Sequence, residues 1–445
     1  MQHDKLVLPR ASWLRAVGIE EIVCVFLLAF FAMQGAIPGI APNQASEMTN
    51  TSATGFMKVA GVGSQVLVNG VICIVILLHF RRLQRFAFSL QWTAALAIFA
   101  VCSTLWSQDA MTTARRSIPF ALATMFALYL ASRFRIRQQL LIFTGTMIVM
   151  AAATIVLALA VPSIGLEAST GHFGNWQGVF TQKNACGRAM VFATAALLSL
   201  RGASFFRFAC LLLFLFVLVM SGSRGAWMIE ALLFVCYALF WILERFNASS
   251  RGILLLISIL ATSVCTLTAW IYFPPIAELL GRDSTLTGRT AIWQQVWIAI
   301  LKHPLLGYGF AAFWEGMKGE SYNVILALRF VIFHAHNGFL EIWLELGAVG
   351  LLLFFLSYMR AWRKLWPVLR SSDLGNAFWM TFVLLLVVLY DLDENTLLTF
   401  NGLYWILYVA AVANIEIMAV EQSQAHRRWV SLKSGSHTVP APAVG

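Results

Sequence analysis

Twelve apolar runs, each about as long as a membrane-spanning helix, occupy most of this 445-residue chain. A transmembrane helix needs about 20 mostly apolar residues. Hydrophobic residues make up 60% of the chain and charged residues 11%, against a charged fraction of roughly 25% in soluble domains. The sequence therefore predicts an all-α polytopic membrane protein with about 12 transmembrane helices. The runs cover approximately residues 19–40, 58–80, 89–107, 117–132, 138–162, 184–200, 206–222, 225–243, 252–273, 337–359, 376–392 and 401–420.

These runs leave little chain for a soluble domain. Residues 1–420 are predicted to form a single integral membrane domain, in which one large outer loop at about 274–336 carries short amphipathic helices. Residues 421–445 are predicted to form a disordered cytoplasmic tail. The first run is long and lacks a convincing cleavage site, so we expect the N-terminus to stay attached.

The distribution of positive charge predicts the topology. With both termini in the cytoplasm, twenty of the 31 Lys and Arg residues fall at cytoplasmic span ends, as the positive-inside rule expects. This pattern accounts for the net charge of +11 without nucleic acid as a partner. The other cations lie at the outer face, where an anionic substrate would explain them: Lys58, Arg115, Arg116, Lys183, Arg188, Arg224, Arg282, Arg289, Lys302, Lys318 and Arg329.

No cofactor motif stands out. The seven cysteines lie in or beside spans without CxxC spacing, so neither a disulfide framework nor a zinc site is indicated. The sequence contains no GxGxxG, P-loop, HExxH or GxSxG pattern. His334 and His336 could form half of a metal site, but no nearby Cys or third His completes it, and we expect no metal.

Two outer cationic sites precede the large loop. Lys183, Asn184 and Arg188 share roughly one face at the start of a span, where charged groups are costly and favour a functional interpretation. The alternative is that Lys183 and Arg188 snorkel to headgroups. Arg224 lies in the short turn SGSRGAW, whose backbone N–H groups and guanidinium suit an anion. The alternative is a plain membrane turn.

The large loop carries a third cation on a predicted helix. Ile292, Trp293, Val296, Trp297 and Ile300 follow an amphipathic pattern, which predicts an interfacial helix from residue 287 or 288 to about Lys302. Arg289 would then occupy the first turn, where a cation opposes the helix dipole. A bound anion would explain that position, whereas the alternative is that Arg289 only anchors the helix.

The loop ends in the segment HAHN at the mouth of the tenth run. His334 and His336 belong to this segment, and Asn337, Glu341 and Glu345 share one face of the following helix. Two carboxylates inside an apolar helix are expected to face a polar cavity or a basic partner.

Six segments together carry a family resemblance: GVFTQKNACGR, SGSRGAW, LTGRTAIW, HPLLGYGFAAFW, HAHNGFLEIWLELGAVG and DENTLLTFNGLYWILY. In this order they resemble the O-antigen ligase and polysaccharide polymerase superfamily of the bacterial inner membrane. Their amino-acid sequences are most similar to those of polymerases of the ExoQ type. The resemblance covers about residues 178–408 and implies a GT-C-like membrane fold.

The resemblance implies transfer of an oligosaccharide from undecaprenyl pyrophosphate to an acceptor hydroxyl at the periplasmic face, without metal or nucleotide sugar. Arg224 and Arg289 match the family's functional arginines, and His336 matches its essential histidine. Lys183, Arg188, Asn337 and His334 would assist in binding substrate, and Glu341 or Glu394 would orient a catalytic group.

The acceptor decides between the activities that this resemblance leaves open. A polymerase extends a lipid-linked repeat unit, whereas a ligase passes the glycan to lipid A-core or to protein. We expect a polymerase, for which a chain-length regulator is a further conceivable partner. A transporter of the lipid-linked glycan is a third interpretation, although it would require polar, broken helices at mid-membrane in both halves.

Overall fold

The structure is a computed structural model that describes residues 18–39, 55–87, 90–167, 174–200, 202, 204–247, 250–251, 289–370, 374–392 and 394–435. The predicted ninth span, at 252–273, and the loop up to residue 288 lie outside the described residues. The helices are α1 (Ile19–Ala32), α3 (Gly55–Ala87), α4 (Gln91–Cys102), η2 (Ser103–Leu105), α5 (Ala110–Arg133), α6 (Ile136–Ala160), α7 (Pro162–Gly165), α8 (Lys183–Ser199), α9 (Phe205–Met220), α10 (Arg224–Leu243), α12 (Arg289–Lys302), α13 (Gly319–Leu328), α14 (Gly338–Arg370), α15 (Leu374–Asp391) and α16 (Leu403–Gly435).

Each of the eleven predicted runs within the described residues is largely helical. In that part of the chain, five helices are long and apolar enough to cross a membrane, judged by length and composition: Gly55–Arg81, Ile136–Ala160, Arg224–Leu243, Gly338–Leu369 and Leu403–Gln424. The helical class is therefore confirmed, while the number of twelve spans stays a prediction.

Two helices end at places that the apolar pattern does not predict. Helix α1 ends at Ala32, well before residue 40, because Gln34 and Gly35 both adopt left-handed backbone conformations. Helix α16 continues to Gly435, which differs from the predicted disordered tail at 421–445. The segment from Glu421 to Lys433 contains no Gly or Pro, and Gln, Ala, Arg and Lys favour helix.

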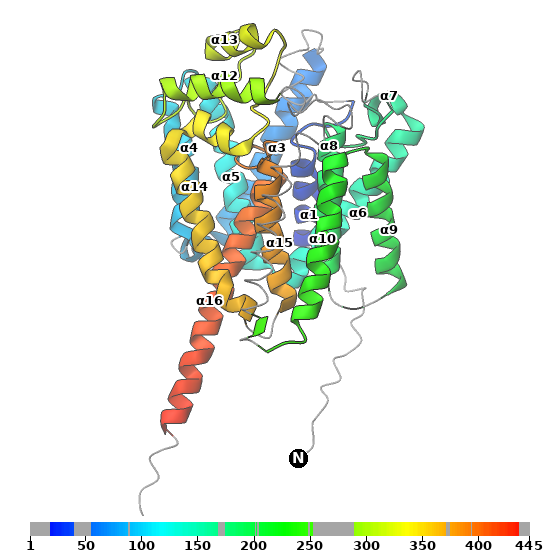
Figure 1. The fold of residues 1–445 in the computed structure, drawn as a ribbon, viewed down its shortest axis with the longest axis vertical. Coiled ribbons are helices and arrows are strands. Elements are labelled where there is room, and N and C mark those ends of the chain that lie inside the picture. Colours follow the sequence, from blue (N-terminus) through cyan, green and yellow to red (C-terminus); the bar gives the residue numbers. More distant parts are fainter. Residues whose placement is uncertain are drawn as a thin grey trace, which may run out of the picture.

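The helices form a bundle with two distinct ends (Figure 1). Helices α8, α10, α14 and α16 begin, and α15 ends, at the end where α12 and α13 form an outer layer. The opposite end carries the start of α1, where Glu20 forms an ion pair with Arg133 at 2.7 Å, and the end of α16. The two ends correspond to the predicted outer loop and the predicted basic face.

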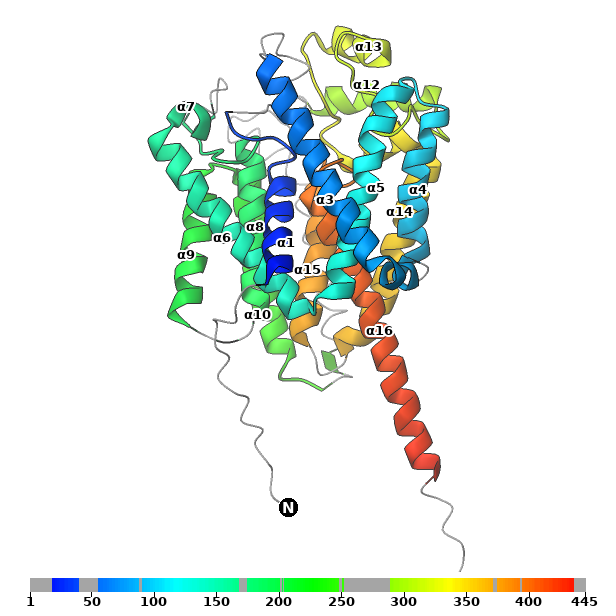
Figure 2. The same cartoon turned by 180° about the vertical axis from the view of Figure 1, so that it is seen from behind.

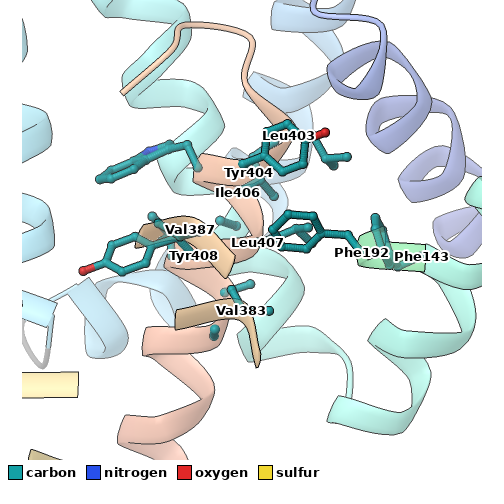
Figure 3. Close-up of a cluster of buried hydrophobic side chains, with 14 of the residues drawn as sticks. Phe143, Phe192, Val383, Val387, Leu403, Tyr404, Ile406, Leu407 and Tyr408 are labelled. Atoms are coloured by element: carbon teal, nitrogen blue, oxygen red, sulfur yellow. The ribbon is translucent and has the colours of Figure 1, made fainter. Parts of the chain in front are cut away.

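Helix α8 lies in the middle of the bundle and is buried along almost its whole length. Phe192 packs with aromatic and aliphatic side chains of α6, α15 and α16 (Figure 3). Its small residues allow close helix contact: a Cβ atom at Gly187 would lie 2.8 Å from the Ser223 Cβ atom. This contact brings the start of α8 against the SGSRGAW turn.

The predicted amphipathic helix is confirmed as α12, but its apolar face packs against protein. Ile292, Val296 and Ile300 are buried in a second apolar cluster with Trp314 of the following loop. Trp297 remains 43% exposed. The short helix α13, whose position in the loop was not predicted, covers part of the same cluster through Val324.

A break in α14 holds the segment that follows α12. Gly347 has φ +66° and ψ −171° inside the helix. There the amide groups of Tyr308 and Gly309 donate to the Leu344 and Glu345 carbonyls, at 3.0 and 2.9 Å, and the amide of Ala348 donates to the Pro304 carbonyl at 2.9 Å. Backbone hydrogen bonds thus fix the outer layer to the bundle.

Gly347→Ala should destabilise the protein, because a Cβ atom there would lie 2.1 Å from the Leu305 carbonyl oxygen in a left-handed conformation. Backbone strain alone costs about 1–3 kcal/mol. Thermal unfolding in detergent should show a clearly lower midpoint than for Gly145→Ala, since nothing lies within 4 Å of a Cβ atom at Gly145. Equal midpoints for the two variants would contradict the close approach.

Candidate active site

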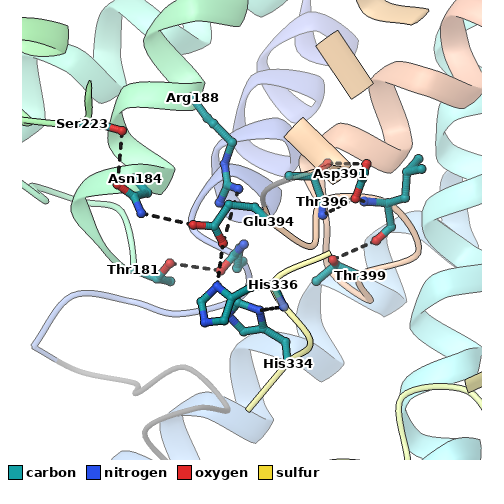
Figure 4. Close-up of polar contacts among 12 residues, drawn as sticks. Thr181, Asn184, Arg188, Ser223, His334, His336, Asp391, Glu394, Thr396 and Thr399 are labelled. Carbon is teal, nitrogen blue, oxygen red and sulfur yellow. Dashed lines mark hydrogen bonds and ion pairs between the residues drawn. The ribbon is translucent and has the colours of Figure 1, made fainter. Parts of the chain in front are cut away.

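The candidate site lies where helix ends from distant parts of the chain meet (Figure 4). Asn184 and Arg188 come from the start of α8, Ser223 from the turn before α10, His334 and His336 from the loop before α14, and Glu394 from the loop after α15. Most of these side chains contact Glu394, so this carboxylate is the natural starting point.

Glu394 is buried and surrounded by donors. Its Oε1 atom accepts a hydrogen bond from Asn184 Nδ2 at 3.1 Å, and its Oε2 atom lies 3.9 Å from Arg188 Nη1 and 3.8 Å from His336 Nδ1. Burial alone would raise the pKa of the carboxyl group, but the contact with His336 and the charge of Arg188 hold that pKa below its ordinary value. Glu394 is therefore an anion at neutral pH.

His336 is the accessible partner of this carboxylate. Its side chain is 31% exposed, while that of Glu394 is 7% exposed. The backbone of His336 is left-handed, with φ +51°, a conformation that is uncommon for a non-glycine residue. A proton on Nδ1 facing Glu394 would leave Nε2 free to accept another proton.

His334 differs from His336 in its chemistry. The backbone amide of His336 donates to His334 Nδ1 at 3.2 Å, and the two ring centroids are 4.0 Å apart. Burial, and next the charge of His336, lowers the pKa of His334 to about 4. His334 is therefore neutral at pH 7, and its ring supports the position of His336.

The backbone between the two histidines is held from both sides. The amide of Ala335 donates to Glu341 Oε2 at 2.7 Å, and the carbonyl of Ala335 accepts from Trp293 Nε1 at 3.1 Å. The other oxygen of Glu341 accepts from Trp314 Nε1 at 2.6 Å. Glu341 was expected to orient an imidazole or an arginine, but these contacts fix the loop backbone instead.

Asn337 joins this loop to the loop that carries Glu394. Its Oδ1 atom caps α14 by accepting from the amides of Phe339 and Leu340, and its Nδ2 atom donates to the Leu392 carbonyl at 3.4 Å. The next residue must be small, because a Cβ atom at Gly338 would lie 1.9 Å from Asp391 Oδ1. Asn337 thus has structural contacts, although it was predicted to bind substrate.

Arg188 lies behind Glu394. The side chain is 3% exposed, and its guanidinium group sits over the rings of Tyr390 and Tyr404, at 5.8 and 5.6 Å from their centroids. Its Nε and Nη1 atoms have no hydrogen-bond partner within the described residues. Buried between two rings, Arg188 is placed to balance the charge of Glu394, which argues against snorkelling to headgroups.

Three other cations stand at the first described residue of a helix. Lys183 begins α8 and is half-buried, Arg224 begins α10 and is exposed, and Arg289 begins α12 and is close enough to His334 to lower its pKa. Cations at this end of a helix oppose its dipole. The starts of α8 and α10, which carry Lys183 and Arg224, are joined by a hydrogen bond in which Ser223 Oγ donates to Asn184 Oδ1 at 3.1 Å.

Two residues of this region are absent from the sequence prediction. Thr181 Oγ1 donates to Gln34 Oε1 at 3.0 Å, which ties the end of α1 to the TQKN segment. For Gln34, the signal available in the sequence was a single Gln followed by Gly at the end of an apolar run.

His334, His336 and Glu394 also satisfy the spacing of a metal site, because one ligand atom from each lies within 4.8 Å of the others. The third of these residues, Glu394, could not be found from local sequence spacing, because it comes from a separate loop. Arg188 already supplies a positive charge to the same carboxylate. The arrangement therefore fits an imidazole–carboxylate pair better than an ion.

Two comparisons show which known proteins this chain is similar to. Residues 209–355, which include Arg224, Arg289 and His336, match the family model described as O-antigen ligase. The exopolysaccharide production protein ExoQ of Rhizobium meliloti strain 1021 is 28% identical over 315 residues, which are 67% of this chain and 70% of that protein. Both comparisons support a similarity of this chain to the O-antigen ligase and polysaccharide polymerase superfamily. The matched region begins in α9 and ends in α14, so it spans the SGSRGAW turn, the outer layer and both histidines.

Proposed function

We propose that this protein polymerises lipid-linked oligosaccharide repeat units. In this reaction an acceptor sugar hydroxyl attacks the anomeric carbon of a glycan carried on undecaprenyl pyrophosphate. The observation that carries the proposal is the pairing of the accessible His336 with the buried anion Glu394, beside helix ends that begin with cations.

The cationic helix ends suit a pyrophosphate leaving group. The N-terminus of a helix attracts anions through its free N–H groups and dipole. Ser223 precedes α10 without capping it through its side chain, because its hydroxyl donates to Asn184. Arg224 and Lys183 would therefore bind phosphate oxygens together with backbone amides, and Arg289 would do so from the side of His334.

His336 would act as the general base. The acceptor O–H bond breaks and its proton moves to His336 Nε2 while the oxygen forms the new glycosidic bond. The bond between the anomeric carbon and the phosphate oxygen breaks, and its electron pair leaves with the pyrophosphate, where the cations stabilise the developing charge. Glu394 stabilises the imidazolium that forms at His336. No step needs a metal ion or a nucleotide sugar.

The bundle polarity supports a periplasmic site. The predicted cytoplasmic cations Arg133, Arg360 and Lys364 lie on helices at the end opposite α12 and α13, and the latter two pair with Glu416. Under the positive-inside rule that end faces the cytoplasm. The histidines then face the periplasm of a bacterial inner membrane.

The two comparisons favour two different acceptors. Similarity to an exopolysaccharide production protein supports a polymerase, whose acceptor is another lipid-linked repeat unit. The match to the O-antigen ligase model supports the alternative, in which the acceptor is lipid A-core or protein. Both activities would use the same base and the same leaving-group site.

His336→Ala should reduce glycan transfer by at least about a hundredfold, the usual contribution of a general base. The assay follows radiolabelled lipid-linked oligosaccharide in proteoliposomes, with chain growth and release of lipid pyrophosphate as separate readouts. The exposed His303 pairs with Tyr308 at the far end of α12, so His303→Ala should keep wild-type activity. Normal chain growth in His336→Ala would refute the base, and transport without bond cleavage by the wild type would refute the enzyme.

Arg224→Lys should lower transfer by about tenfold to a hundredfold, which corresponds to the loss of one hydrogen bond to a charged group. Lysine keeps the charge but cannot offer the planar pair of donors that phosphate accepts. Arg245, which lies just beyond the other end of α10 against Trp241, provides the matched control Arg245→Lys. Equal activities of the two variants would mean that Arg224 is only an anchor.

A deletion strain should separate polymerase from ligase. Loss of a polymerase leaves single repeat units on the lipid carrier, whereas loss of a ligase leaves long polymer on it. Mass spectrometry of the extracted lipid-linked glycans measures this directly. Single units are the expected result, and carrier-linked polymer would assign the chain as a ligase.

A further inference from the structure

A row of amide side chains leads away from the histidines along the outer part of the bundle. Gln65 in the first third of α3 and Asn401 before α16 exchange two hydrogen bonds, at 3.1 and 2.6 Å, and Gln65 Nε2 also donates to Asn69 Oδ1 at 3.2 Å. A Cβ atom at Gly35 would lie 2.8 Å from Asn401 Nδ2, so the turn of Gln34 rests on this pair. Figure 2 shows α1 and α3 on the same face of the bundle.

The row reaches the candidate active site through Thr181. Thr181 donates to Gln34, and Figure 4 shows Thr181 on the same side of Glu394 as the ring of His336. Gln34 and Asn401 both have left-handed backbones, with φ +55° and +57°. Such conformations carry strain and concentrate where a structure holds a ligand.

Amides in membrane helices often serve only to join helices, and this protein contains such a pair for comparison. Gln139 of α6 and Asn414 of α16 also exchange two hydrogen bonds, at 3.1 and 2.9 Å. Their remaining amide hydrogens go to the carbonyls of Phe134 and Ala410, at 2.8 Å each. Every N–H of this pair is satisfied inside the protein.

Unlike the Gln139–Asn414 pair, the outer row has amide N–H groups that no described residue accepts. Within the described part of the chain, neither Gln34 Nε2 nor Asn69 Nδ2 donates to a protein acceptor, and both side chains are only half-buried. Each amide also offers an oxygen, so the row presents donors and acceptors without net charge. Sugar hydroxyls, which both donate and accept, match this chemistry better than phosphate or hydrocarbon does.

We propose that Gln34, Asn69 and their partners Gln65, Asn401 and Thr181 bind the acceptor oligosaccharide. The inference rests on the proposed function, because it assigns the neutral amides to the acceptor and the cationic helix ends to the donor pyrophosphate. Through Thr181 the row joins the segment that leads into α8, so a sugar bound to the row would lie next to the candidate site and present a hydroxyl to His336. The amides hold the neighbouring hydroxyls and thereby select which sugar attacks.

The test compares Gln34→Leu and Asn69→Leu with Gln139→Leu in lipid nanodiscs. The probe is the repeat-unit oligosaccharide released by mild acid from the lipid-linked glycan of the source strain. Its binding without donor is measured by saturation-transfer NMR, and transfer from lipid-linked glycan is followed against its concentration. The two outer variants should weaken binding and raise the half-saturating acceptor concentration by about tenfold, the effect of one lost hydrogen bond, whereas Gln139→Leu should change neither by more than about twofold.

Equal behaviour of the outer and inner variants would overturn the inference, and so would a wild-type protein that does not bind the oligosaccharide. A change in donor half-saturation, with acceptor binding intact, would also overturn it by assigning the row to the donor. Binding by the wild type without transfer would instead refute the proposed function and leave the amide site standing.

Discussion

A single buried carboxylate organises the outer end of this protein. Glu394 would be costly to bury as an anion without compensation, and three side chains from two elements provide it: Asn184 by a hydrogen bond, Arg188 by charge and His336 by its ring. Because Arg188 itself is enclosed by two tyrosine rings, neither charge can turn toward solvent. The half-buried imidazole of His336 is therefore the member of the group that solvent and substrate can reach.

The surrounding helices carry two kinds of polar surface. Helices α8 and α10 begin with Lys183 and Arg224, and the close contact at Gly187 holds these two helix starts together. The turn after α1 and helix α3 carry uncharged amides. A reaction between an anionic donor and a neutral acceptor needs one surface of each kind near the base, which is the arrangement that we propose.

Much of the fold and part of the candidate site could be predicted from the sequence. Apolar run length predicted the helices, because hydrocarbon thickness imposes it. A cation opposing a helix dipole indicated Arg289, the Gly/Ser turn indicated Arg224, and costly charge at the start of a span indicated Lys183. The sequence could not predict that Glu394 rather than Glu341 meets His336, since that choice depends on how two separate loops pack around Asn337 and Gly338. Gln34 was also hidden, because an amide at the end of an apolar run has no local pattern. The burial of Ile292 and Val296 against protein likewise depends on the distant Trp314.

The attachment of the outer layer to α14 bears on how such proteins diversify. At the Gly347 break, residues 304–309 are held through main-chain atoms, which every amino acid possesses. Exposed side chains between α12 and α13, such as Leu305 and Leu306, can therefore change while the histidines keep their place, whereas Trp314 is fixed by its hydrogen bond to the Glu341 carboxylate that holds their loop. The reaction centre is in this way separated from a rim that is free to vary.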